Sequence, residues 1–144
     1  MKKNLVVFII LFLIIIAVFY TIMINYRSNE REIQAFNKYY EENLNKTLLG
    51  SDVATTINKA TNSNERNGVT KGDNGMYIDN ETNSIRVFVR LSKYRDYYPM
   101  ETITSHDITE FMRTFNLADF NCTKIIYHDK TKKVAEVYFD ILED

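Results

Sequence analysis

One long apolar run limits what this sequence can fold into. Residues 5–24 form twenty consecutive positions without a charged side chain. As a helix they would rise about 30 Å, the thickness of the hydrocarbon core of a bilayer, and a helix satisfies its backbone polar groups without water. Tyr20 and Tyr26 suit the headgroup boundary at one end of the run. The sequence therefore predicts a membrane-spanning helix over residues 5–25, behind a short basic tail at residues 1–4.

A cleaved signal peptide is the main alternative for the same run. The apolar part of a signal peptide usually has about 7 to 15 residues and precedes a small-x-small cleavage site. This run is longer, and the bulky residues 22–27 offer no such site. We therefore expect the helix to be retained as an anchor.

The expected side of the membrane depends on a nearly balanced count of positive charges. Lys2 and Lys3 precede the run, whereas Arg27, Arg31 and Lys38 follow it, and the more positive flank normally stays in the cytoplasm. Two lysines directly before an apolar run are typical of an uncleaved signal anchor. We therefore expect the amino terminus inside the cell and the domain outside, with the protein in the cell membrane.

The rest of the chain is short and mildly acidic. Of the 18 basic residues in this 144-residue chain, two precede the run, which leaves 16 basic residues against 19 acidic ones. Such a balance argues against a nucleic-acid-binding face, which needs a basic patch. The remaining length suffices for one modest core, so we expect a single small domain.

An amphipathic helical segment is predicted over residues 26–60. Apolar residues recur there every three or four positions, which marks one face of a helix. This candidate helix interface consists of Ile33, Phe36, Tyr40, Leu44 and Leu48. This face could pack against a helix of a neighbouring chain. Packing on the domain's own sheet is favoured, because a small sheet must bury one face against another element. Gly50 should end this helix, and Ser51 should cap a second, short one.

The remaining segments predict a loop and then a sheet. Residues 61–75 hold three of the four glycines and almost no apolar residues, which predicts a flexible loop. In residues 76–144, short runs alternate between apolar and polar positions, as half-buried strands do. The predicted elements are strands at 76–78, 84–91 and 99–104, a helix from Asp107, and a hairpin of 122–128 with 133–141.

These elements together predict an α+β fold. A transmembrane helix continues into an amphipathic helix, and a small antiparallel β-sheet with one inserted helix follows. A sheet of this size buries one face against the helices and leaves the other face in water.

Side chains that could support catalysis are few and scattered. His106 and His128 are the only histidines and lie in separate predicted elements, and Cys122 is the only cysteine. No spacing typical of a zinc site, a phosphate-binding loop or paired catalytic carboxylates occurs. We interpret the histidines as neighbours of caps and turns, and the cysteine as a small buried side chain. We therefore assign no catalytic residue, metal ligand or cofactor and expect no enzyme.

One predicted loop gathers aromatic and basic side chains and is the best candidate for a binding site. Tyrosine and arginine offer a large contact area at a low entropic cost, and they are enriched at binding surfaces. The alternative is a hairpin loop whose tyrosines only cover the edge of the core. The candidate partner-binding residues are Arg90, Tyr94, Arg95, Tyr97 and Tyr98.

The layout of the chain resembles a known group of proteins. A short basic tail, an apolar helix that runs into an amphipathic one, and then a small sheet are similar to type IV pilins, pseudopilins and small pilus-assembly proteins of the tight-adherence kind. Residues 2–6 lack both the glycine before the processing site and the glutamate early in the mature helix that such pilins carry. Residues 49–59 and 120–133 also look like uncharacterised small single-pass membrane proteins of clostridia, which implies no function.

These observations favour a non-enzymatic, membrane-anchored binding or assembly protein with an extracytoplasmic domain. Residues 5–24 would contact the lipid bilayer, and the domain would contact other membrane or surface proteins but no nucleic acid. Assembly of the chain into a homo-oligomer stays open. The alternative is a pilin-like or pseudopilin-like structural subunit of a surface filament or a secretion apparatus.

Overall fold

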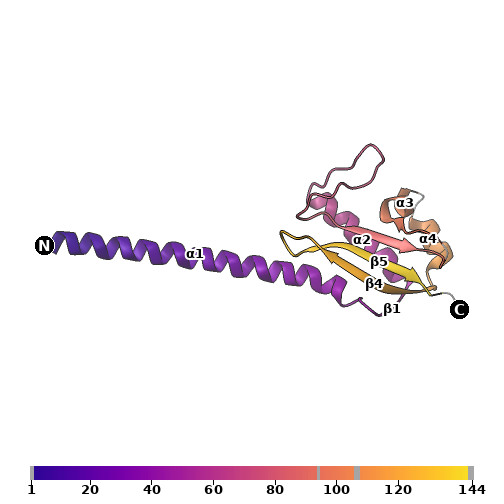
Figure 1. Ribbon diagram of the computed structural model, residues 1–144, viewed down its shortest axis with the longest axis horizontal. Helices are drawn as coiled ribbons and strands as arrows, with labels where there is room; N and C mark the ends of the chain where they lie inside the picture. Colours follow the sequence, from indigo (N-terminus) through magenta and orange to yellow (C-terminus); the bar gives the residue numbers. More distant parts are fainter. Residues whose placement is uncertain (1, 94, 106–107, 143–144) are drawn as a thin grey trace. The chain divides into compact units, whose positions relative to one another are not determined.

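The computed structural model describes residues 2–93, 95–105 and 108–142 (Figure 1). Its contacts divide the chain into two units, residues 1–35 and residues 36–144. The first unit is helical, and the second holds a sheet and several short helices.

The first unit consists of most of helix α1 (Lys2–Glu41), whose last turns from Phe36 onward belong to the second unit. By length and composition, α1 can cross a membrane. Its apolar side chains from Val6 to Ile24 are exposed, and such a surface is unfavourable in water. The predicted apolar helix is confirmed, and Ile33 of the predicted helix interface belongs to this unit.

The second unit is built on a five-stranded sheet with the order β1-β4-β5-β2-β3. The strands are β1 (Thr47–Leu49), β2 (Arg86–Arg90), β3 (Tyr98–Pro99), β4 (Asp119–Tyr127) and β5 (Val134–Ile141). The α+β class and the antiparallel hairpin of β4 with β5 are confirmed. The sheet is mixed and not purely antiparallel, because β2 and β5 run parallel. Between these two strands the chain passes through β3, two helices and β4, which is long enough for a parallel return.

Helices cover one face of this sheet. They are α2 (Gly50–Arg66), which lies behind the strands in Figure 1, α3 (Met100–Ser105) and α4 (Ile108–Phe115). The helix predicted near residue 107 is α4, although Asp107 itself lies outside the described residues. Fully buried side chains between the sheet and the helices include Val53, Ile57, Val87, Val89, Met100, Phe120, Val137 and Phe139.

Helix α2 is longer than the sequence predicts. Residues 61–66 continue the helix, so the flexible loop predicted at 61–75 is wrong in its first part. Ser63 and Asn64 are polar but buried, which explains why composition alone misplaces this boundary. The helix ends before Gly68, whose φ of 63° is a left-handed conformation that glycine adopts without strain.

The predicted helix interface does not lie on one helix. Helix α1 ends at Glu41, Leu44 lies in a turn that bridges to Cys122, and Leu48 lies in β1. Asn45, with a φ of 59°, adopts a left-handed conformation in the turn between α1 and β1. The residues after it pair with β4, whose backbone N–H and C=O groups would otherwise lack partners at this edge.

The last turns of α1 pack on the rest of the second unit through aromatic rings and one asparagine. Tyr40 is only 3% exposed, and Phe36 packs beside it with 5.4 Å between the ring centroids. The Asn37 side chain donates from Nδ2 to the Lys132 carbonyl (2.8 Å) and accepts at Oδ1 from the Val134 N–H (2.9 Å). Its amide thus pairs with the backbone as a neighbouring strand would.

A second asparagine joins α2 to the start of β2. Asn64 is fully buried, and its Nδ2 donates to the Ile85 carbonyl at 2.7 Å. The Ile85 N–H in turn donates to Asn64 Oδ1 at 2.8 Å. Both backbone polar groups of this buried residue are therefore satisfied by one side chain.

The strand predicted at residues 99–104 is wrong. Strand β3 ends at Pro99, and helix α3 begins at the next residue. Pro99 itself lies in β3, and proline is tolerated there because β3 is an edge strand of the sheet. Met100 and Ile103, at helical spacing, then both enter the core.

The strand predicted at residues 76–78 does not join the sheet. Tyr77 instead forms an isolated antiparallel bridge with Lys71 inside the loop that follows α2. The loop is held on α3, because the Tyr77 N–H donates to Glu101 Oε1 at 3.0 Å. This side-chain acceptor replaces the strand partner that the sequence pattern predicts.

Candidate functional site

The face of the sheet opposite the helices carries a regular set of paired side chains. Strand β2 presents a cation, an aromatic ring and a second cation at alternate positions, and β5 presents an anion, an aromatic ring and a second anion in register with them. Neighbouring strands bring such opposed side chains into contact. We call this surface the open face; it consists of Arg86, Phe88, Arg90, Tyr97, Lys124, Glu136, Tyr138 and Asp140.

Each arginine of the open face is held by an acid on β5. Arg90 donates from Nε and Nη2 to the two carboxylate oxygens of Asp140, at 3.1 and 2.8 Å. This bidentate contact fixes the plane of the guanidinium group and raises its pKa. Arg86 lies 3.9 Å from Glu136 in a looser ion pair. Acids of β5 therefore hold both arginines in position.

Three aromatic rings fill the space between these ion pairs. Phe88 and Tyr138 stack with 4.9 Å between their centroids and 15° between their planes. Tyr97 meets Tyr138 edge-on at 5.1 Å. The guanidinium groups of Arg86 and Arg90 lie over Phe88 and Tyr97, at 4.6 and 4.8 Å from the ring centroids. Such contacts restrict the rotamers of all five side chains.

The Tyr138 hydroxyl is also fixed in place. It donates to Glu136 Oε2 at 2.5 Å, and the Lys124 ammonium lies 5.3 Å from its ring centroid. Burial, followed by the hydrogen bond to Glu136, raises the pKa of Tyr138 to about 12. The hydroxyl therefore stays protonated at neutral pH and keeps donating.

The structure divides the predicted partner-binding residues between two surfaces. Arg90 and Tyr97 lie on the open face. Tyr98 belongs to β3 and lines a groove on the helical side. Arg95 is exposed and lies 3.5 Å from the Tyr98 hydroxyl, and Tyr94 lies outside the described residues. The two neighbouring tyrosines therefore serve different surfaces.

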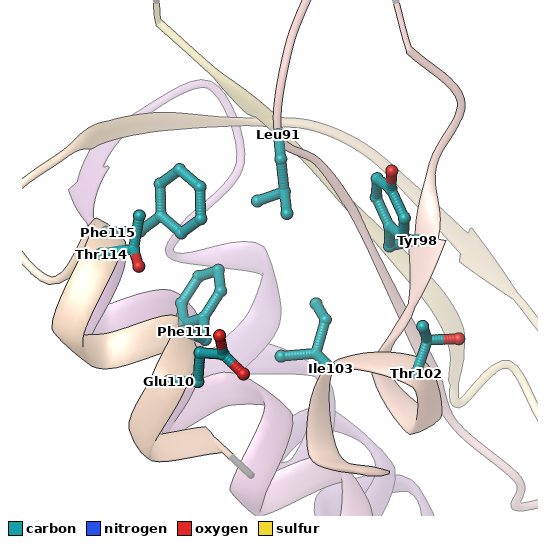
Figure 2. Close-up of a pocket in the computed structure, with 8 residues that line it drawn as sticks. All are labelled: Leu91, Tyr98, Thr102, Ile103, Glu110, Phe111, Thr114 and Phe115. Carbon is teal, nitrogen blue, oxygen red and sulfur yellow. The ribbon is translucent and has the colours of Figure 1, made fainter. Parts of the chain in front are cut away.

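The second surface is an apolar groove between the end of β2, β3, α3 and α4, with a volume of about 450 Å³. Figure 2 shows Phe111 and Phe115 on one side, Tyr98 on the other, and Leu91 and Ile103 between them. The Glu110 carboxylate projects toward the space that these side chains surround (Figure 2). The apolar groove is lined by Leu91, Tyr98, Thr102, Ile103, Glu110, Phe111, Thr114 and Phe115.

His128 fastens a loop to the sheet. Its side chain is buried, its Nε2 lies 2.6 Å from the Ser84 carbonyl oxygen, and its Nδ1 lies 3.8 Å from Asp79 Oδ1. Both ring nitrogens thus face groups of the loop before β2. Within the described residues, no group of three or more His, Cys, Asp and Glu side chains could hold a metal ion. His106 lies outside the described residues.

Cys122 lies in the core, on the side of β4 that faces the helices. Its exposed fraction is zero, and burial raises the pKa of its thiol to about 11. A protonated and shielded thiol is a poor nucleophile at neutral pH. The arrangement gives Cys122 the surroundings of a packing residue.

The pairing of side chains on the open face cannot be predicted from the sequence. The alternation in β5 places three residues on the side that faces solvent, Glu136, Tyr138 and Asp140. It does not indicate which residues they contact. The available signal is the matching spacing in Arg86–Arg90 and Glu136–Asp140, where charges flank an aromatic residue two positions away on each side. It becomes informative only with the parallel register of β2 and β5.

No family model, no curated protein and no solved structure matches this chain.

Proposed function

We propose that the chain is a non-enzymatic, membrane-anchored binding or assembly protein whose open face contacts another membrane or surface protein. The observation that carries this proposal is the aromatic set of Phe88, Tyr97 and Tyr138, which is held between two Arg–acid pairs. Among the described elements, the helices that pack on this sheet bury its other face.

The open face has the physical properties of a preformed contact surface. Tyr and Arg dominate the binding energy of many protein interfaces. Rings and guanidinium groups that are already fixed lose little conformational entropy when a partner binds. Exposed cross-strand pairs contribute only about 0.2 to 1 kcal/mol each to the stability of a sheet, so stability alone is a weak reason for so many of them.

The partner contact can be tested with two neighbouring tyrosines on opposite surfaces. Tyr97→Ser removes a ring from the open face, and we expect at least about a tenfold weaker complex, as for loss of an aromatic anchor. Tyr98→Ser is the matched control, because Tyr98 lines the apolar groove. The measurement is recovery of cross-linked partner proteins from native membranes, with thermal unfolding as a check on both variants. Equal recovery with Tyr97→Ser and the unchanged chain would remove the open face from the proposal.

The proposal places residues 5–24 in the cell membrane, with the amino terminus in the cytoplasm and the second unit outside. Its support is the length of the apolar helix and the lysine pair before it. Ile78 is 51% exposed, so we expect Ile78→Cys to react with a membrane-impermeant maleimide in intact cells. The unchanged chain, whose single cysteine is buried, is the control. Labelling only after permeabilisation would place the second unit in the cytoplasm.

A pilin-like subunit is the second candidate function. It is favoured by one observation, that α1 continues from the apolar run to Glu41 without a break and ends in the second unit. A filament of this kind requires the apolar helices to leave the bilayer and bundle together. Chains in sheared surface material would support this candidate, whereas full-length chains confined to membranes support the anchored binding protein.

A further inference from the structure

The apolar groove lies apart from the open face, on the helical side of the sheet. Its aromatic and aliphatic side chains surround a space of about 450 Å³ that no described side chain fills (Figure 2). This volume lies within the range of protein binding pockets, about 300 to 1,000 Å³. Water in contact with such a lining is unfavourable, so an apolar occupant would be stabilised there.

Next to this groove, one apolar side chain projects into solvent. Leu117 is 77% exposed, which is the largest value among the apolar side chains described in residues 36–144. It lies two residues after Phe115, which lines the groove. The turn that carries it is fixed, because the Asn116 N–H donates to the Met112 carbonyl at 3.1 Å and the Ala118 N–H donates to the Phe115 carbonyl at 3.0 Å. Leu117 is therefore exposed on a turn whose backbone is hydrogen-bonded on both sides of it.

We propose that Leu117 of each copy enters the apolar groove of a second copy, so that this surface is a homodimer interface. In a two-fold symmetric contact the same patch of both subunits must supply the projecting group and the site that receives it. This surface meets that condition, because it holds both the apolar groove and, just after α4, the exposed leucine. The interface buries the leucine and removes water from the groove at the same time.

The charged side chains on α4 of one copy complement those on α4 of a second copy. Glu110 lines the groove, and its intrachain pair with Arg113 is long, at 3.8 Å, with both side chains largely exposed. When two copies of α4 meet antiparallel, Glu110 of one copy faces Arg113 of the other, and the reverse pair forms by symmetry. The groove carboxylate also disfavours a fatty acid or an anionic lipid as the occupant, because like charges repel.

Membrane anchoring favours this contact without being required for it. Two chains confined to one membrane meet at a higher effective concentration than two chains free in solution. The inference goes beyond the proposed function, since it holds whichever protein the open face binds. The two surfaces are lined by different residues, so their failures can be told apart.

Disulfide cross-linking of the full chain in membranes tests the contact. One tagged chain carries Leu117→Cys and a second, differently tagged chain carries Thr102→Cys in the groove. We expect a disulfide-linked heterodimer on mild oxidation. Ile78→Cys replaces Thr102→Cys in the control pair, which should stay unlinked, and the native Cys122 is buried and unreactive. Equal linking of both pairs would overturn the assignment, because it would report random collision.

Energy-transfer measurements on full chains in vesicles supply the second test. We expect Leu117→Asp to weaken the dimer at least about tenfold, as for the loss of a buried leucine, while Leu117→Met keeps it. Glu110→Lys alone should weaken the dimer, and Glu110→Lys with Arg113→Glu should restore it. A dimer insensitive to Leu117→Asp, a chain monomeric at every density, or a co-purified lipid in the groove would each overturn the proposal. Leu117→Asp should leave recovery of the open-face partner unchanged, which separates this test from that of the proposed function.

Discussion

Replacing Gly50 with alanine should lower the free energy of unfolding by about 3 kcal/mol or more, a large value for an overpacked site. A Cβ atom on Gly50 would lie 1.9 Å from the carbonyl oxygen of Phe115 and 2.7 Å from the carbonyl carbon of the same residue. The backbone at the end of α4 must then move. The same contact region holds the hydrogen bond from the Gly50 N–H to the Ala118 carbonyl at 2.9 Å, so this movement also weakens the start of α2.

Thermal and urea unfolding of the full chain in detergent measure this effect. Gly72→Ala is the matched control, because a Cβ there comes no closer than 3.2 Å, to the Asn74 side chain, and otherwise meets only Ile78 at ordinary contact distances of 3.8 and 3.9 Å. Its expected effect is within about 0.5 kcal/mol. A similar decrease in the free energy of unfolding for both variants would show that the close approach of α4 to Gly50 does not cause the destabilisation.

Replacing Asn64 with leucine should destabilise the second unit by about 3 kcal/mol. The substitution leaves the N–H and the C=O of buried Ile85 without their partners, and each unpaired buried group costs about 1 to 3 kcal/mol. Hydrogen exchange gives a specific readout, since the Ile85 amide should lose protection more than the amides of β4.

Asn62→Leu is the control for this substitution. Asn62 lies on the same helix but is exposed, so the same change there should alter stability by less than about 0.5 kcal/mol. An Asn64→Leu variant as stable as Asn62→Leu, with the Ile85 amide still protected, would contradict the role given to this side chain.

The elements that the sequence predicts well are those whose pattern is local. The uncharged run of residues 5–24 is long enough to allow only a helix, and the alternation in residues 133–141 marks a strand with one buried face. In α4, the spacing of Phe111 and Phe115 fixes a helical face. In each case the decisive contacts lie within one element or between chain neighbours.

The elements that the sequence misses depend on partners far along the chain. Leu48 continues the helical spacing of the apolar residues before it, yet residues 47–49 form a strand that pairs with residues 119–121 of β4. The polar residues 61–66 stay helical because Asn64 bonds to Ile85, more than twenty positions away. The parallel pairing of β2 with β5 likewise follows from the path of the chain and not from the pattern of either strand.

The same reason limits what the sequence says about the two surfaces. The tyrosine-rich loop is recognisable from composition, but Tyr97 and Tyr98 are assigned to different surfaces only by the position of β3. The acids that hold Arg86 and Arg90 come from β5, fifty positions later. The apolar groove combines the end of β2 with two helices, one of which the sequence predicts as a strand.

Photo-cross-linking from the open face tests directly whether this surface contacts another protein. Phe88 would be replaced by a photoreactive phenylalanine analogue in the full chain, expressed in the cells that normally make it, and Asn62 on α2 would carry the same group as the control. We expect a discrete protein adduct from position 88 that is absent from position 62 and is reduced by Tyr97→Ser. Membrane-bound, folded chains that give no protein adduct from position 88, or the same adducts from both positions, would contradict this expectation.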